Sequence, residues 1–164
     1  LRFMEAREYI EVLFGEPRAK QKTLVHLLTP YIRSFEAKGL TIAQTAAHVE
    51  KIGKTTLQLL NVETTFSRNF YPKPGKCVGI LHDAKKEQGV SSLVSGGYGP
   101  DFLTLRATDE ANFSVRDLIH FLNKHAPEAF VEGGGHKNAG AIKFIPREQE
   151  KVLRFLKQFI KERS

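Results

Sequence analysis

The stretch VEGGGHKNAGA (residues 131–141) carries most of the information in this sequence. It joins a helix predicted over 114–125 to a strand predicted over 139–145. Glycine loses more conformational entropy on folding than any other residue, so three in a row suggest positive φ or close approach of another molecule. We therefore interpret 133–136 as a loop whose backbone N–H groups cradle an anion. His136 and Asn138 are the side chains placed to hydrogen-bond the same ligand.

A plainer interpretation stays open for this stretch. Three glycines can form a flexible turn with a solvated histidine beside it, and short glycine motifs are weak signals on their own. The stretch does not match G-x-G-x-x-G, and the chain contains no Walker A sequence. The anion-binding interpretation therefore depends on what surrounds the glycines.

Outward from this stretch, apolar patterns alternate between strand and helix periods. The predicted strands are 56–62, 76–82, 102–107 and 139–145, and the predicted helices are 88–95, 114–125 and a segment that begins at Pro146. This alternation predicts an α/β fold with a compact mixed or mostly parallel sheet and flanking helices. The connections from 76–82 to 102–107 and on to 139–145 are long enough for parallel pairing.

The first third of the chain has a different pattern. Apolar residues at helical spacing predict helices over 3–13, 17–39 and 41–53, with a kink or break at Pro30. We therefore expect a helical linker or appendage over 1–53 and an α/β domain over 54–164.

Composition excludes several classes of protein. Of 164 residues, 41% are apolar and 26% charged, which is typical of a globular chain. The single cysteine, Cys77, excludes an internal disulfide framework and a four-cysteine zinc site. Neither a membrane span nor a signal segment is visible, so we expect a cytoplasmic protein with no membrane partner. Because the chain begins at Leu1 rather than Met, we expect a fragment of a longer protein.

The net charge of +7 suits an anionic partner such as nucleic acid, although it also fits a solvated basic surface. Arg106 is the cation of most interest, because strand alternation places it on the face opposite Leu103 and Leu105. A guanidinium there can hold a phosphate with two hydrogen bonds. The alternative is a surface ion pair with Asp109 or Glu110.

Two further features have weaker interpretations. The basic residues of the C-terminal helix fit a phosphate track, and they fit an ordinary amphipathic helix slightly better. The aromatic residues Phe66, Phe70, Tyr71 and Tyr98 are candidate platforms for base stacking, although most aromatics belong to cores.

These residues together resemble a known family. Gly133-Gly134-Gly135-His136 is followed by Ala139-Gly140, and Arg106 lies on a strand upstream. This pattern resembles the DHH-associated domain, the C-terminal substrate-binding domain of DHH-family phosphoesterases. Gly89-Val90 after His82-Asp83 resembles the RecJ branch of single-strand exonucleases. Within that branch, the segment 76–83 and the helical lead-in most resemble the archaeal members. The resemblance covers residues 54–146 well.

The resemblance implies that this chain binds substrate for a metal-dependent phosphodiesterase or exonuclease. The substrate-binding residues that it implies are Arg106, Gly133, Gly134, Gly135, His136 and Asn138. Two positions depart from the family pattern, since Ala107 replaces the usual serine and Asn138 a small residue. The chain has no Asp-His-His motif, so the resemblance places no catalytic residue or metal here. Manganese or magnesium is expected on an upstream DHH domain of the same polypeptide.

The implied partners are single-stranded DNA or RNA, with replication or repair proteins as further partners. Two other functions stay open. The chain can be a non-catalytic nucleic-acid-binding or protein-docking module, since a related domain ends the alanyl-tRNA synthetases. It can also belong to a phosphoesterase of small oligonucleotides or cyclic dinucleotides.

Overall fold

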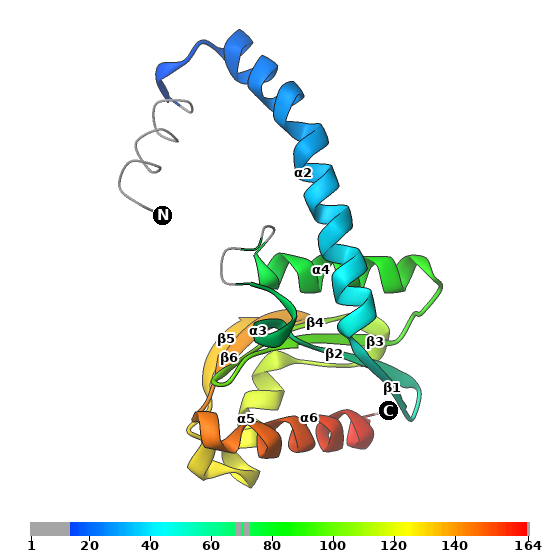
Figure 1. Ribbon diagram of the computed structural model, residues 1–164. Coiled ribbons are helices and arrows are strands. Elements are labelled where there is room, and N and C mark those ends of the chain that lie inside the picture. The colour runs from blue at the N-terminus through cyan, green and yellow to red at the C-terminus, as the bar shows by residue number, and fades with distance from the viewer. Residues whose placement is uncertain (1–13, 68–69, 71–72, 164) are drawn as a thin grey trace. The chain divides into compact units, whose positions relative to one another are not determined.

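The computed structural model describes residues 14–67, 70 and 73–163 (Figure 1). The chain divides into two compact units, Leu1–Ala37 and Lys38–Ser164. The helix predicted over 3–13 lies outside the described residues. The candidate site residues all belong to the second unit, so the fold of that unit matters most here.

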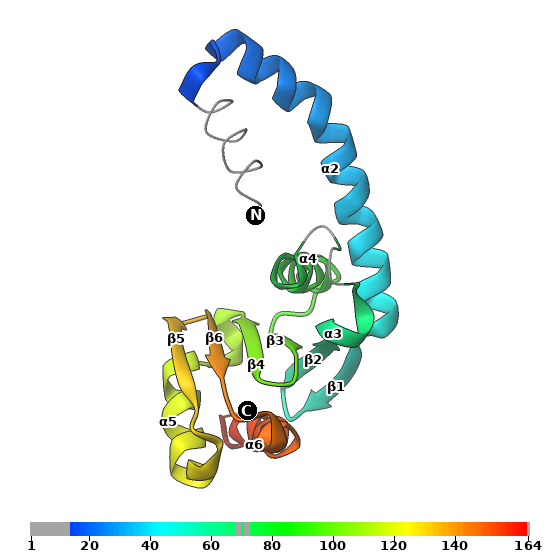
Figure 2. The same cartoon turned by 60° about the vertical axis from the view of Figure 1, so that its left-hand side comes forward.

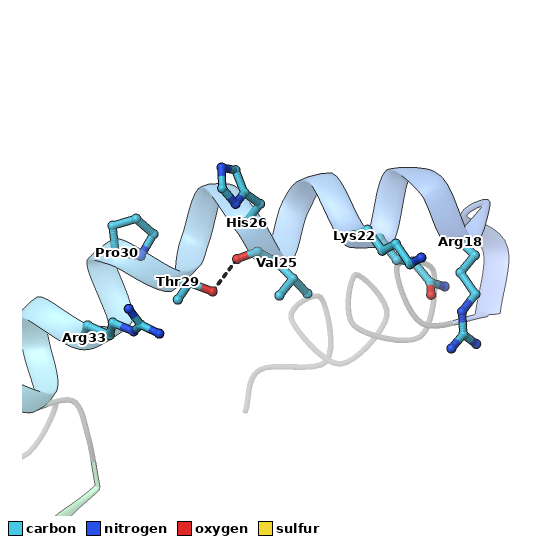
Figure 3. Close-up of a pocket in the computed structure, with 8 residues that line it drawn as sticks. Arg18, Lys22, Val25, His26, Thr29, Pro30 and Arg33 are labelled. Carbon is cyan, nitrogen blue, oxygen red and sulfur yellow. Dashed lines mark hydrogen bonds between the residues drawn. The ribbon is translucent and has the colours of Figure 1, made fainter.

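The first described helix, α2, spans Arg18–Ala46. It runs through Pro30, so the predicted break is absent; proline there removes only the N–H that would bond to the carbonyl of His26 (Figure 3). Gly39 is buried inside this helix rather than ending it. The helix predicted over 41–53 is also wrong in its second half, because His48–Ile52 forms strand β1.

A six-stranded sheet forms the centre of the second unit. Its strands are β1 His48–Ile52, β2 Thr55–Asn61, β3 Leu93–Tyr98, β4 Phe102–Ala107, β5 Glu132–His136 and β6 Ala139–Lys143. Their order in space is β1-β2-β3-β4-β6-β5. Only β2 and β3 pair in parallel within the described sheet, and the other four pairs are antiparallel. The mixed α/β fold is confirmed.

The parallel pairing predicted for 102–107 and 139–145 is wrong. After β4 the chain crosses through α5 (Val115–His125) and returns along β5, at the edge of the sheet. A two-residue turn then reverses the chain into β6, which lies between β5 and β4. Because β6 is the returning arm of this hairpin, it pairs antiparallel with both neighbours.

Two neighbouring predictions are wrong because they exchange helix and strand. The strand predicted over 76–82 lies within helix α4, Pro74–Glu87, and the helix predicted over 88–95 overlaps β3. The buried residues of α4 include Cys77, Val78, Leu81 and His82, which is the spacing of one helix face. Gly97 lies in β3 and makes room for this helix, since a Cβ there would clash with the side chain of Val78.

The helices cover the two faces of the sheet unequally. Figure 2 shows α4 on one face, and α5 and α6 (Gln149–Arg163) on the other. Leu103, Leu105 and Ile142 face α5 and α6 and lie in the larger apolar core. Ser114 caps α5 as predicted, accepting a hydrogen bond from the backbone N–H of Asp117. The remaining short helices are α3 Val62–Thr65, η2 Asp109–Ala111, η3 Pro127–Ala129 and η4 Pro146–Glu148. None of the described helices combines the length and apolar character that a bilayer crossing needs.

The glycine run is a strand rather than the predicted loop. Gly133, Gly134 and Gly135 belong to β5, and the turn falls at residues 137–138. Gly133 and Gly135 have φ of +152° and +159°, an extended conformation that is essentially restricted to glycine. A Cβ at either position would collide with the β6 backbone, at the carbonyl oxygens of Ala141 and Ala139 respectively. A Cβ at Gly134 would meet nothing within 4 Å.

Alanine substitutions test this description of β5. We expect Gly133→Ala to lower the free energy of unfolding by about 1–3 kcal/mol or more, because a strained φ is forced on a residue that also clashes. Gly134→Ala is the matched control and should change it by less than about 0.5 kcal/mol. Urea unfolding measures both. Equal effects of the two substitutions would contradict the close approach of β5 and β6.

Candidate functional site

Cross-strand pairing brings Arg106 and His136 onto one face of the sheet. Arg106 on β4 lies opposite Ala139 on β6, and Ala139 lies opposite His136 on β5. Directly opposite residues of antiparallel strands project to the same side. The two candidate side chains are therefore separated by one alanine, with Cα atoms about 10 Å apart across two strand spacings.

The same register defines two further rows. Thr104, Ala141 and Gly134 form the middle row, and Phe102, Lys143 and Glu132 form the end row. We call the nine residues of the three rows the open face. The middle row has small residues on β5 and β6, so it forms a shallow floor between two ends that carry long side chains.

The open face is accessible over β5 and β6. Within the described part of the second unit, Arg106, His136 and Ala141 are exposed, and no atom stands within 4 Å of the position above Gly134. The main sheet contacts of α4 are with β3 and β4, and Figure 2 shows no labelled helix of this unit above β5 and β6. One end of this face of the sheet is therefore left accessible by the described residues of the second unit.

Arg106 rests against α4 at Gly79. A Cβ at Gly79 would lie 3.1 Å from Nε and 3.3 Å from Cζ of Arg106, so the absence of a side chain there leaves room for the guanidinium. Arg106 forms no ion pair with any residue that the structure describes. The alternative of a pair with Asp109 or Glu110 is therefore not what the structure shows, and the charge is available to a ligand.

Asn138 has a different position from the other candidates. Its Nδ2 donates to Oδ1 of Asp109 at 2.7 Å, and Nζ of Lys137 lies 3.4 Å from the same oxygen. These two contacts hold the pKa of Asp109 below its usual range. The carbonyl of Asn138 also accepts the backbone N–H of Ala107 at 2.7 Å. In this structure Asn138 anchors the β5–β6 turn.

The departure from the family pattern at 107–108 also has a structural basis. Ala107 is buried in the core on the α5 side of the sheet. The hydroxyl of the next residue, Thr108, accepts the backbone N–H of Leu93 at 2.9 Å. Thr108 therefore ties β3 to the end of β4 and does not supply a hydroxyl to the open face.

A buried polar cluster beneath α4 is absent from the sequence predictions. Gln58 donates from Nε2 to Ser95 Oγ at 2.6 Å, and that hydroxyl lies 2.7 Å from Nδ1 of His82. Since Ser95 accepts from Gln58, its proton is free to go to a neutral His82. Ser95 is also the β3 partner of Arg106. The cluster could not be found from the sequence because the apolar run at 76–82 predicts a strand rather than a helix facing the sheet.

Charges on α6 are largely engaged within the chain. Lys151 pairs with Glu128, Lys157 with Glu50 at 2.6 Å, and Arg163 with Asp117 at 3.2 Å. Arg163 also lies 4.4 Å from the centre of the Phe159 ring. These contacts favour the interpretation of α6 as an ordinary amphipathic helix.

The candidate stacking aromatics have mixed outcomes. Phe66 is buried in the smaller core beneath α4, with its ring centre 4.8 Å from that of Phe70. Tyr98 is partly buried against the larger core. Tyr71 lies outside the described residues. None of the three described rings belongs to the open face.

A separate hollow follows the first half of α2, in the first unit. Figure 3 shows Arg18, Lys22 and Arg33 beside it, with the Thr29 hydroxyl donating to the Val25 carbonyl at 2.6 Å. It contains none of the candidate site residues. Across the residues that the structure describes, no group of three or more His, Cys, Asp or Glu side chains is placed to hold a metal ion.

Comparison with known proteins places this arrangement in context. No protein-family model matches the chain. An uncharacterized protein, MJ1198 of Methanocaldococcus jannaschii, is 36% identical over 103 residues, which are 59% of this chain and 14% of that protein. A structure of PF0399, described as a member of a family of ribosomal proteins and containing a DHH domain, is 31% identical. It matches with a TM-score of 0.84 over 98% of this chain and 38% of its own.

Two more distant structures share the fold. RecJ from Thermus thermophilus, solved in complex with Mg²⁺, matches at TM-score 0.59 with 18% identity, over 98% of this chain and 23% of its own. PggH from Vibrio cholerae, a pGpG-specific phosphodiesterase, matches at TM-score 0.55 with 16% identity, over 88% of this chain and 43% of its own. The chain thus spans less than half the length of each of these proteins.

The chain has the fold found in DHH-domain proteins. Within that group, its fold is RecJ-like. The expectation drawn from the glycine-histidine stretch is confirmed at this level.

The buried His82 predicts a pH-dependent stability. Burial lowers the pKa of His82; Lys86 and Arg106 lower it further, and Asp83 opposes them. The unfolded chain therefore takes up a proton at a higher pH than the folded chain. The contribution of neutral His82 to the free energy of unfolding should be fully present above the ordinary histidine pKa. It should be lost as the pH falls toward the lowered pKa of the folded state. Urea unfolding at pH 7.5 and 5.5 measures the drop in the free energy of unfolding between the two pH values. This drop should be smaller in His82→Gln. The exposed His120→Gln is the control, and an equal loss in both variants would contradict this assignment.

Proposed function

We propose that this chain is the substrate-binding part of a metal-dependent phosphodiesterase or exonuclease that acts on single-stranded nucleic acid. Arg106 neutralises a phosphate of the terminal nucleotide, and His136 hydrogen-bonds the same phosphate or its sugar. The observation that carries the proposal is the row Arg106–Ala139–His136 on an accessible face with a floor of small residues.

The glycines contribute in a different way from the predicted nest. Because Gly133, Gly134 and Gly135 have no side chains, the middle of β5 brings its backbone close to any ligand lying on Gly134. As the last strand of the sheet, it also leaves a row of backbone N–H and C=O groups without strand partners. Both features suit a ligand that combines a flat base with a charged backbone.

The similarity to RecJ and PggH supports a phosphoester substrate for the protein that contains this chain. The manganese or magnesium and the reacting water are assigned to a separate DHH domain of the same polypeptide, since this chain supplies no set of ligands among its described residues. Replication or repair proteins are proposed as further partners, and the cytoplasm as the location.

A second candidate is a phosphoesterase of short oligonucleotides. The length of the open face favours it, because its first and last rows are four residues apart, about 14 Å. This distance accommodates about one nucleotide rather than a long strand.

Substitution of Arg106 and of His136 tests the proposed function. In the full-length protein, we expect Arg106→Ala and His136→Ala each to weaken binding of single-stranded oligonucleotides about tenfold or more. Hydrogen bonds to charged groups are worth about 1.5–3 kcal/mol. Loss of one phosphate contact should also reduce, by about one, the steepness with which the logarithm of the binding constant falls with the logarithm of the salt concentration. Fluorescence anisotropy measures affinity, and manganese-dependent exonuclease assays measure turnover.

The control for these variants is Lys161→Ala on α6, which lowers the net charge as Arg106→Ala does but lies outside the open face. It should leave affinity within about twofold, as expected for an exposed cation away from the phosphate. Unchanged affinity and turnover in both row variants would overturn the assignment. A preference for dinucleotides over longer strands would favour the second candidate.

A further inference from the structure

The end row of the open face has its own hollow. Phe102, Lys143 and Glu132 lie opposite one another across three strands. They border an open hollow of about 440 Å³, which is also lined by Gly133, Ala141 and Ile142. The middle row separates this hollow from Arg106 and His136. A molecule held by its phosphate at the first row would therefore reach the end row with its other end.

Phe102 presents a fixed aromatic surface to the hollow. Its ring is half-buried and packs against the smaller core beneath α4. Gly99 allows this packing, because a Cβ there would approach Cζ and Cδ1 of the ring to 2.8 and 2.9 Å. A ring held in this way can contact a base at little cost in side-chain entropy.

Lys143 and Glu132 supply opposite hydrogen-bonding capacities at adjacent positions. Both are exposed, and neither forms an ion pair with any residue in the described part of the chain. The lysine ammonium only donates hydrogen bonds, whereas the ionised carboxylate only accepts them. A ligand that satisfies both must offer an acceptor next to donors along one edge.

We propose that the end row is a nucleobase subsite selective for guanine; this rests on the function proposed above. Guanine carries the O6 acceptor beside the N1–H and N2–H₂ donors. Lys143 donates to O6, and the two oxygens of Glu132 accept from N1–H and N2–H₂. The other bases lack two adjacent donors next to an acceptor. Ala141 and Gly133, which also line the hollow, leave room for the base beside the Phe102 ring.

The test compares oligonucleotides that differ only in their terminal nucleotide, at either end. With the full-length protein and fluorescence anisotropy, we expect a terminal guanine to bind roughly tenfold more tightly than adenine, cytosine or thymine. Glu132→Gln should remove this preference, measured as the ratio of the affinities for terminal guanine and terminal adenine. Lys143→Met should reduce the preference as well. The control is Glu110→Gln on η2, which should retain the full guanine preference.

The outcomes separate this inference from the proposed function. One outcome is that binding depends on Arg106 but the four terminal nucleotides bind equally; another is that Glu132→Gln leaves the ratio of guanine to adenine affinity unchanged. Either outcome would overturn the base subsite and leave the proposed phosphate contacts of Arg106 and His136 in place. If the full-length protein binds none of these oligonucleotides, both are overturned. Glu132→Gln lies on an exposed edge strand, so it tests selectivity without depending on a core substitution such as Phe102→Leu.

Discussion

The close approach of the β5 and β6 backbones is the constraint on which the candidate site depends. Gly133 and Gly135 have no side chains, and their positive φ directs the missing Cβ atoms into the neighbouring strand. The hairpin therefore lies flat, and the alternate position, Gly134, faces outward above a bare floor. Arg106, His136 and the end row are brought together by this pairing. If β5 carried side chains at these two positions, the register that aligns the three rows could not form.

Much of the second unit could be predicted from the spacing of apolar residues, because that spacing follows which face of each element is buried. The strand over 102–107 and the helix over 115–125 have clear periods, and Ser114 is an ordinary cap. The alternation that separated Arg106 from Leu103 and Leu105 holds in the structure because one face packs on α5 and α6. Where one side of an element is buried and the other is exposed, the sequence is sufficient to predict the type of element and its buried face.

The failures have a common physical origin. Helix α4 and strand β3 meet through glycine and small side chains, so the apolar run at 76–82 has the pattern of a strand and Gly96-Gly97 has the pattern of a break. Both patterns reflect close tertiary contact, which a sequence window does not contain. The role of Asn138 could not be predicted for a similar reason, since its partner Asp109 is 29 residues away. For the site, residue types were sufficient to name Arg106 and His136, and strand alternation puts Phe102 on the face of Arg106, but only the register shows that Lys143 and Glu132 share it.

The insertion of β6 between β4 and β5 has a consequence for how this chain folds. β5 has no native pairing with β4, because β6, which follows later in the chain, lies between them. The hairpin can form from local contacts and then dock as one piece, which is fast compared with assembling distant strands one by one. Its small side chains provide few contacts to prevent a slip by one residue. Burial of Ile142 and the tether from Asn138 to Asp109 are then the features that select the native alignment.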